Sequence, residues 1–173
     1  MASKIKVDTL ETANGSGTIA LSNQLSGMTS ASMPSGSVIQ VVSATSVTGT
    51  ATTSTTYVAT GVTATITPSA TTSKILILVN GSAYLQNNNF LVLTIKRGTT
   101  DLADGRTYGL ASSRLRGGTD LGFQVGMSYV DSPATTSATV YEVFLRGTAG
   151  TVEFPAPSSA PTTCQISLME IQG

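Results

Sequence analysis

The chain alternates between apolar and polar residues along most of its length, and this constrains its fold more than any other feature. The clearest stretch places Leu121, Phe123, Val125, Met127 and Tyr129 on one side, with small or polar residues between them. Successive side chains of a β-strand point to opposite faces, so this pattern is typical of strands with one buried face. No stretch beyond residue 36 has the 3.6-residue period of an amphipathic helix. The chain is therefore predicted to be all-β.

Other stretches repeat this alternation. Val62, Ala64 and Ile66 alternate with threonines, and Pro68 ends that strand. Residues 75–79 are aliphatic on both faces, which predicts a strand covered on both sides, either central or at a subunit contact. This strand is predicted over residues 74–83. Further strands are predicted at residues 38–44, 90–96 and 140–146, with a last strand whose inner face carries Cys164, Ile166 and Leu168.

Turn-forming residues separate these strands at short intervals. Asn87, Asn88 and Asn89 lie between two predicted strands, and asparagine tolerates the left-handed backbone of tight turns, so a hairpin is predicted there. Many short strands without helices are typical of a sandwich or barrel. We predict an antiparallel β-sandwich of about eight strands, similar to a jelly roll, over residues 35–173.

The low charge of the chain excludes several classes of partner. Charged residues make up 10% of the sequence, and nine Lys and Arg balance nine Asp and Glu. A chain without net charge has no field that would attract nucleic acid or anionic lipid. The aliphatic run at residues 75–79 is far shorter than the roughly 20 residues of a membrane span. Neither nucleic-acid binding nor membrane insertion is predicted, and the start of the chain has no signal-peptide core.

Residues 1–34 differ from the rest of the chain and are predicted to form an arm. Two short alternating stretches, residues 5–8 and 18–21, flank a turn-forming Asn-Gly-Ser-Gly segment. Such short strands cannot form a core alone and are stable only when they pair with another chain. A disordered tail is the alternative. The arm residues expected to make contacts are Ile5, Val7, Leu10, Ile19 and Leu21.

The sequence is poor in residues that perform catalysis. It contains no histidine, which removes the commonest general base and the commonest metal ligand. Asp101, Asp104 and Asp120 could supply two carboxylates for glycoside cleavage, or oxygen ligands for calcium, but they match no calcium-loop spacing. Cys164 is the only cysteine and is expected in the core. We predict a non-enzymatic protein without metal or cofactor.

A surface for binding is predicted in and near residues 99–119. A loop of this length in a compact domain usually has a function, although residues 106–110 could form another strand. Aromatic rings near loops could stack on sugars, and arginines could bind anionic groups. The alternatives are core residues for the aromatic rings and solvated charges at strand ends for the arginines. The candidates are Tyr84, Phe90, Arg97, Tyr108, Arg114 and Arg116.

Several strings in the chain resemble structural proteins of marine tailed bacteriophages, cyanophages above all. Residues 3–21, SKIKVDTLETANGSGTIAL, are similar to the N-terminal segment of such proteins. The body resembles the distal domain of their tail-fibre-like proteins in three strings: residues 66–77, ITPSATTSKILI; residues 129–136, YVDSPATT; and residues 166–171, ISLMEI. Together the strings cover about a quarter of the chain, and none contains an active-site motif.

This resemblance implies a virion protein made in the host cytoplasm. It implies a homotrimer whose arms attach to other virion proteins while the sandwich faces outward to a host glycan or outer-membrane protein. The first hypothesis is therefore a short tail fibre or adsorption protein. The sequence has no shaft between arm and sandwich, which a long fibre would need, so a capsid decoration or head-fibre protein is the alternative. A lectin-like module and a polysaccharide hydrolase are further hypotheses.

Overall fold

The computed structural model describes residues 33–86, 88–148, 150–156 and 162–173. Strands are the only regular elements in these ranges, which confirms the all-β prediction, and no described segment forms a helix able to cross a membrane. The strands are β1 (Val38–Ser46), β2 (Thr50–Thr52), β3 (Val58–Ile66), β4 (Lys74–Leu85), β5 (Phe90–Arg97), β6 (Thr100–Asp101), β7 (Ala111–Arg114), β8 (Leu121–Asp131), β9 (Thr139–Arg146), β10 (Val152–Phe154) and β11 (Cys164–Ile171).

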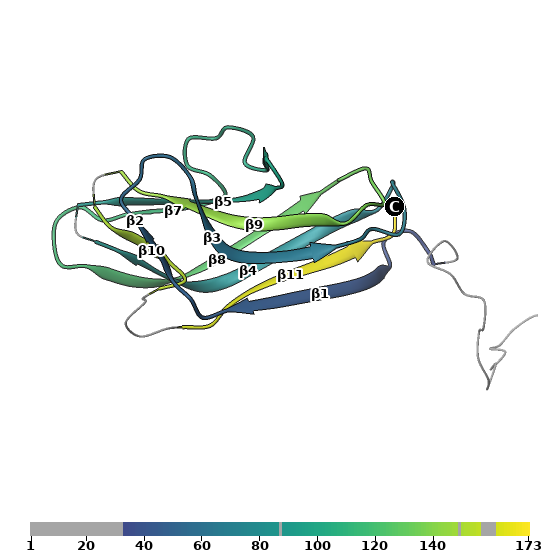
Figure 1. Ribbon diagram of the computed structural model, residues 1–173, viewed down its shortest axis with the longest axis horizontal. Coiled ribbons are helices and arrows are strands. Elements are labelled where there is room, and N and C mark those ends of the chain that lie inside the picture. Colours follow the sequence, from purple (N-terminus) through teal and green to yellow (C-terminus); the bar gives the residue numbers. More distant parts are fainter. Residues whose placement is uncertain (1–32, 87, 149, 157–161) are drawn as a thin grey trace, which may run out of the picture.

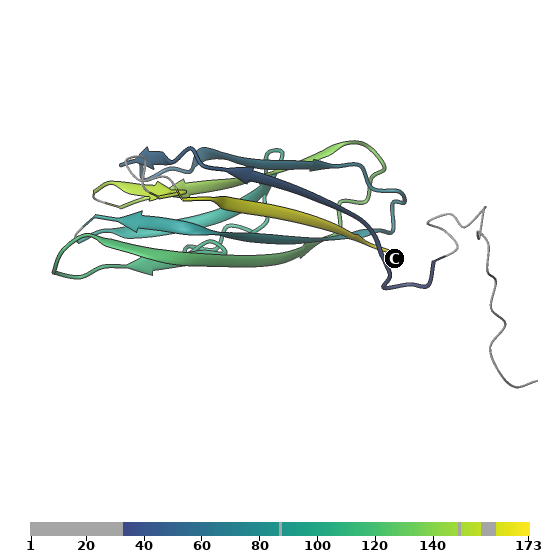
Figure 2. The same cartoon turned by 90° about the horizontal axis from the view of Figure 1, so that it is seen from below.

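The strands form two antiparallel sheets that pack face to face (Figure 1). The six-stranded sheet has the order β1-β11-β4-β10-β2, and β8 pairs with the other edge of β4. In the five-stranded sheet the order is β3-β9-β5, and both β6 and β7 pair with β5. The long strands of both sheets run along the long axis of the molecule (Figure 2).

The long strands pair in a nested order. β1 pairs with β11, β3 with β9, β4 with β8 and β5 with β7, and successive pairs alternate between the two sheets. A long antiparallel ribbon folded over in this way is a jelly roll, which leaves few open edges. The predicted jelly-roll sandwich is therefore confirmed. The three remaining strands, β2, β6 and β10, have only two or three residues each.

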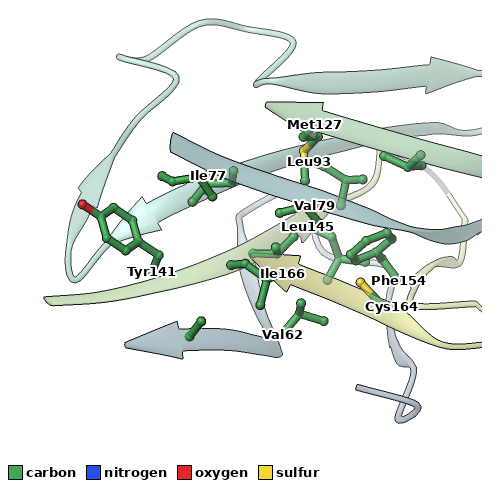
Figure 3. Close-up of a cluster of buried hydrophobic side chains, with 14 of the residues drawn as sticks. Val62, Ile77, Val79, Leu93, Met127, Tyr141, Leu145, Phe154, Cys164 and Ile166 are labelled. Carbon is green, nitrogen blue, oxygen red and sulfur yellow. The ribbon is translucent and has the colours of Figure 1, made fainter. Parts of the chain in front are cut away.

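The hydrophobic core fills the space between the sheets (Figure 3). The side chains predicted to face inward from β3 and β11 are all buried, which confirms those two strands. In β8, Val125 and Met127 are buried, and Phe123 and Tyr129 pack against the core. Leu121 was also expected inside, but it is 40% exposed because it begins the strand at the edge of the sandwich.

A glycine in β4 allows the two halves of the core to meet closely. A Cβ atom on Gly81 would lie 2.9 Å from the Cys164 sulfur and 3.2 Å from the Phe154 ring. The side chains of Cys164 and Phe154, both fully buried, fill the space that a side chain at position 81 would occupy. Burial raises the pKa of Cys164 to about 11, so the thiol remains protonated and unreactive at neutral pH. Cys164 is a core residue, as predicted.

One expectation about β4 needs correction. The asparagine turn does not close a hairpin, because β4 belongs to the six-stranded sheet and β5 to the five-stranded sheet. Asn88 does adopt the left-handed conformation, with a φ of 56°, but the turn leads the chain from one sheet to the other. β4 is an inner strand of its sheet, as one of the two alternatives predicted. Within this chain Ile75, Ile77 and Val79 on its inner face are buried, whereas Leu76 and Leu78 on its outer face are half-buried.

The sandwich has two distinct ends. At the proximal end β1 begins and β11 terminates, so the first described residues lie beside the C-terminus (Figure 2). The opposite, distal end carries β2, β10 and the start of β5 (Figure 1). Residues 1–32 of the predicted arm, including all its expected contact residues, lie outside the described residues. The chain enters the sandwich at the proximal end.

Buried polar groups connect the elements of the proximal end. Asp131 of β8 accepts hydrogen bonds from the Tyr141 hydroxyl (2.7 Å) and from Arg97 Nη1 (3.1 Å), which links the two sheets. Glu170 accepts bonds from the Ser69 hydroxyl and amide, the Ser73 hydroxyl and the Gln40 amide. Burial alone would raise the pKa of the Glu170 carboxyl, but these hydrogen bonds outweigh it and lower the pKa.

We predict that Glu170→Gln lowers the free energy of unfolding at pH 7 by about 1–3 kcal/mol, because the amide cannot accept all of these buried hydrogen bonds. The ionised carboxylate stabilises the fold fully above about pH 4.3, the ordinary pKa of Glu. That contribution disappears as the pH falls through the lower pKa of the folded state. Urea unfolding between pH 7 and pH 3 should show a shallower acid dependence for this variant. Ser73→Ala should be intermediate, and parallel curves for all three proteins would contradict the assignment.

Candidate binding site at the distal end

A pocket of about 550 Å³ opens on the outer face of the five-stranded sheet at the distal end. We call it the distal pocket. Its volume lies within the roughly 300–1,000 Å³ range of sites that bind small molecules. The pocket is lined by Asn88, Asn89, Phe90, Thr107, Tyr108, Ser112, Arg114, Arg146 and Thr148.

Three neighbouring strands place the side chains of the pocket floor. Phe90 begins β5 and lies opposite Arg114 of β7, while Val92 lies between Ser112 of β7 and Arg146 of β9. Leu91 and Leu93 face the core, so the alternate residues of β5 must face outward. The outward alternation of three strands therefore brings together an aromatic ring and two guanidinium groups that are distant in sequence.

The loop between β5 and β7 folds over the outer face of the sheet to form one wall of the pocket. Asp101 holds the loop, because its Oδ1 accepts hydrogen bonds from the Thr94 hydroxyl (2.5 Å) and the Ala103 amide (2.9 Å). Thr94 and Val92 point outward but are fully buried under this loop. Residues 106–110, which could have formed a strand, instead make a turn, and residues 99–119 contain the two short strands β6 and β7.

Gly109 brings the loop down beside β5. Its φ is +60°, and a Cβ atom would lie 2.3 Å from the Leu93 carbonyl oxygen. The next amide, of Leu110, donates a hydrogen bond to that same carbonyl (2.9 Å). This close approach places Tyr108 against Phe90, with ring centroids 5.3 Å apart and the planes at 77°. Such an edge-to-face contact is the arrangement that aromatic pairs favour.

Two asparagines hold the rim of the pocket. The Asn89 Oδ1 accepts hydrogen bonds from the Phe90 amide (2.8 Å) and the Thr148 amide (3.1 Å), so it connects the start of β5 with the segment after β9. The Asn88 Oδ1 accepts a hydrogen bond from the Gly117 amide (2.9 Å). The rim is therefore fixed by side-chain hydrogen bonds to the backbone.

The pocket lining has positive charge and no acidic residue. Arg146 donates a hydrogen bond from Nη2 to the Thr107 carbonyl (2.6 Å), and its guanidinium lies 5.3 Å from the centre of the Tyr57 ring. Arg114 is exposed and, among the described residues, has no hydrogen-bond or ion-pair partner. Because each guanidinium carries five donor hydrogens, both arginines retain donors for a ligand.

The structure brings together only some of the residues predicted from sequence. Phe90, Tyr108 and Arg114 line the distal pocket. Arg97 is instead in the proximal ion pair with Asp131, and Tyr84 lies on the other sheet. Tyr84 donates a hydrogen bond to Asp120, which raises the pKa of the tyrosine hydroxyl. Arg116 is exposed and does not line the pocket.

The most important residue that sequence reasoning missed is Arg146. It occupies the last position of β9, where an arginine is an ordinary solvated strand end. Thr107 and Thr148 were also missed, because threonine is common throughout the chain. The useful signal was strand alternation, which shows that Arg146 faces outward. Placing it beside Phe90 also requires the pairing of β5 with β9, which the sequence does not specify.

The three aspartates considered for catalysis or calcium binding have separate surroundings. Asp101 accepts a hydrogen bond from the Ala103 amide in the loop, and Asp120 accepts one from the Tyr84 hydroxyl. Asp104 lies in a turn and has a φ of 50°. Within the described ranges, no three side chains of histidine, cysteine, aspartate or glutamate are grouped so that they could hold a metal ion. The distal pocket offers hydrogen-bond donors and aromatic surfaces, which suit binding.

Comparison of the sequence with models of protein families and with curated proteins found no match. The function must therefore be inferred from the fold, the two ends of the sandwich and the chemistry of the pocket.

We predict that Gly109→Ala displaces Tyr108 and destabilises the protein, because the new methyl group would collide with the Leu93 backbone. Gly105→Ala is the matched control, since Gly105 also has a positive φ, +69°, but has no atom within 4 Å of its Cβ position. Both variants bear the left-handed backbone strain of about 1–2 kcal/mol. Only Gly109→Ala should lose a further 1–3 kcal/mol or so from overpacking and change the near-ultraviolet circular dichroism of the tyrosines. Equal effects of both changes in urea unfolding and spectrum would contradict this role.

Proposed function

We propose that this chain is a non-enzymatic structural protein of a tailed-bacteriophage particle, and that it acts as a short tail fibre or adsorption protein. The observation that carries the proposal is the separation of the two ends. The arm enters at the proximal end, whereas the distal pocket lies where β5 begins and β9 terminates. The twelve residues of β4 span roughly 40 Å at 3.3 Å per residue. A rigid sandwich of this length suits attachment at one end and binding at the other.

The similarity of residues 3–21 to the N-terminal segments of phage structural proteins supports an attachment role for the arm. The described core does not depend on that segment, since all buried core residues lie between Val62 and Leu168. The first described backbone contact is also made without it, because the Gly36 amide donates to the Gln172 carbonyl at 2.8 Å. Attachment and folding should therefore be separable.

We predict that deleting residues 1–34, the predicted arm, leaves a folded sandwich that no longer joins particles. Tagged full-length and truncated proteins can be expressed during infection, and purified particles can be analysed by quantitative mass spectrometry. The truncated protein should unfold at nearly the same urea concentration as the full chain and should be absent from particles. Normal incorporation of the truncated protein would show that the arm is not the anchor.

The outer face of the six-stranded sheet supports self-association. Val41, Met169, Leu76 and Val130 are in register on four adjacent strands and form what we call the apolar row. Val41 is 54% exposed and Val130 is 51% exposed. Large apolar side chains that lie together on a surface commonly mark a contact with another protein.

The chemistry around the apolar row favours a second copy of this chain as the occupant. The next two rows toward the distal end contain only serine, threonine, leucine, asparagine, glutamine and glycine, so no charge lies on them, and the row on the proximal side has one charge, on Lys74. A face that is uncharged over most of its length can converge around a symmetry axis with little like-charge repulsion. The row also lies near the proximal end, where the arms of associated chains would emerge together. We propose a homotrimer formed through this face.

We predict that Val130→Lys abolishes self-association, because an unpaired ammonium group would be buried in the interface. Val140→Lys is the matched control, since Val140 is 44% exposed on the outer face of the other sheet. Light scattering at micromolar concentration should give trimers for the parent and the control, and monomers for Val130→Lys. A monomeric parent, or equal behaviour of the two variants, would contradict the proposed interface.

A capsid decoration or head-fibre protein is the second candidate. The observation that favours it is the short connection between arm and sandwich, because the arm predicted from sequence ends at residue 34 and β1 begins at Val38. Without a shaft the sandwich would lie close to the particle surface. Copy number distinguishes the two candidates, since a decoration protein is present in far more copies per particle than a tail fibre.

A further inference from the structure

We propose that the distal pocket binds an acidic sugar, a pyranose ring that carries a carboxylate or a sulfate group. This inference rests on the proposed role in host-surface binding and names the class of ligand that the surface would present. Three features of the pocket carry it: an exposed aromatic ring that is held in place, two arginines without an acidic neighbour in the lining, and short neutral hydrogen-bonding groups around them.

The aromatic feature is Tyr108, which is 61% exposed although it lies in a turn that is fixed from two sides. Phe90 contacts the Tyr108 ring edge to face, and Gly109 holds the backbone next to it against β5. A large aromatic side chain that remains exposed in a fixed position is available as a platform. The C–H groups of a pyranose pack well on the electron-rich face of such a ring.

The charged feature is the pair Arg114 and Arg146, which approach the pocket from β7 and β9 on either side of β5. A guanidinium binds a carboxylate or sulfate through two parallel charge-assisted hydrogen bonds. Arg146 is held by the Thr107 carbonyl and the Tyr57 ring, so its position is fixed before a ligand arrives. An anion between the arginines would gain directed bonds with little ordering of Arg146.

The neutral feature selects a sugar rather than a bare anion. Ser112, Thr107 and Thr148 contribute short hydroxyl side chains to the lining, and Asn88 contributes an amide. Sugar hydroxyls both donate and accept hydrogen bonds, and hydroxyl and amide side chains offer both functions. A pocket of about 550 Å³ also has more room than an inorganic anion requires. The combined chemistry therefore fits a hydroxylated ring with one anionic substituent.

The experiment measures binding of defined tetrasaccharides to the full chain by isothermal titration calorimetry. The first probe is a tetrasaccharide of galacturonate. The second is the corresponding galactose tetrasaccharide carrying sulfate groups, and the third is the galacturonate tetrasaccharide with its carboxyl groups reduced, which is uncharged. Inorganic sulfate is the fourth. At least one acidic tetrasaccharide should bind about tenfold or more tightly than the reduced one, and inorganic sulfate should bind more weakly than the better-binding acidic tetrasaccharide. Carboxylate and sulfate arms then show which acidic group the site prefers.

The variants assign that binding to the pocket. Arg114→Gln and Tyr108→Ala should each weaken binding of the acidic sugar about tenfold or more, whereas Arg116→Gln, an exposed arginine outside the lining, should leave it unchanged. Equal losses in Arg114→Gln and Arg116→Gln would overturn the proposal, because they would indicate only nonspecific attraction. Equal binding of acidic and reduced sugars, tight binding of inorganic sulfate alone, or no binding of any probe would also overturn it.

The result is separate from the test of the proposed function. Arg114→Gln leaves the arm and the apolar row intact, so this variant should still trimerise and join particles. If it joins particles and the parent binds no acidic sugar, the ligand class is wrong and the virion role stands. If the parent binds the acidic sugar but is absent from purified particles, the virion role is wrong and the pocket assignment stands.

Discussion

The burial of the inner face of β4 between the two sheets is the interaction on which the rest of the structure depends. Ile75, Ile77 and Val79 are fully buried, and the same strand pairs with β11 and β10 on one edge and with β8 on the other. Removing an aliphatic side chain from such a position typically destabilises a protein by several kcal/mol. Because β4 connects early and late strands, its burial holds together the nested order of the jelly roll. The close contact of Gly81 with Cys164 and Phe154 depends on the same strand.

The two ends of the sandwich have different chemistry, so they are suited to different roles. At the proximal end, buried carboxylates are satisfied within the protein, as Glu170 and Asp131 show, so their charges serve stability. In the distal pocket the charges are cationic and lack acidic neighbours in the lining, so they remain available to a ligand. β4 and β8 connect the two ends and are paired without interruption from Ile75 opposite Asp131 to Leu85 opposite Leu121. Under the proposed function, the sandwich is a rigid spacer between attachment and recognition.

Strand alternation predicted most of the fold but little of the site. It identified the buried faces of β3 and β11 because local sequence decides which side of a strand is apolar. The hairpin predicted from the asparagine turn at Asn88 was wrong, because a turn sequence does not specify whether the next strand belongs to the same sheet. Alternation also could not place Phe90 near Arg146, because the two residues are neighbours only through the pairing of β5 with β9. Arg97 illustrates the converse: it has the same side-chain chemistry as Arg146, yet a buried carboxylate lies next to it. Pairing between distant strands, which local patterns cannot specify, determined each of these outcomes.

The orientation of the sandwich on the particle tests the central claim most directly. Cryo-electron microscopy of purified particles, with an antibody fragment bound to an epitope beside Tyr108, would show which end faces outward. A rigid spacer attached by its arm predicts the fragment on the side of the sandwich farthest from the particle, with the proximal end against the surface. Fragment density between the sandwich and the particle would contradict the account, because the end assigned to recognition would then be the end that attaches.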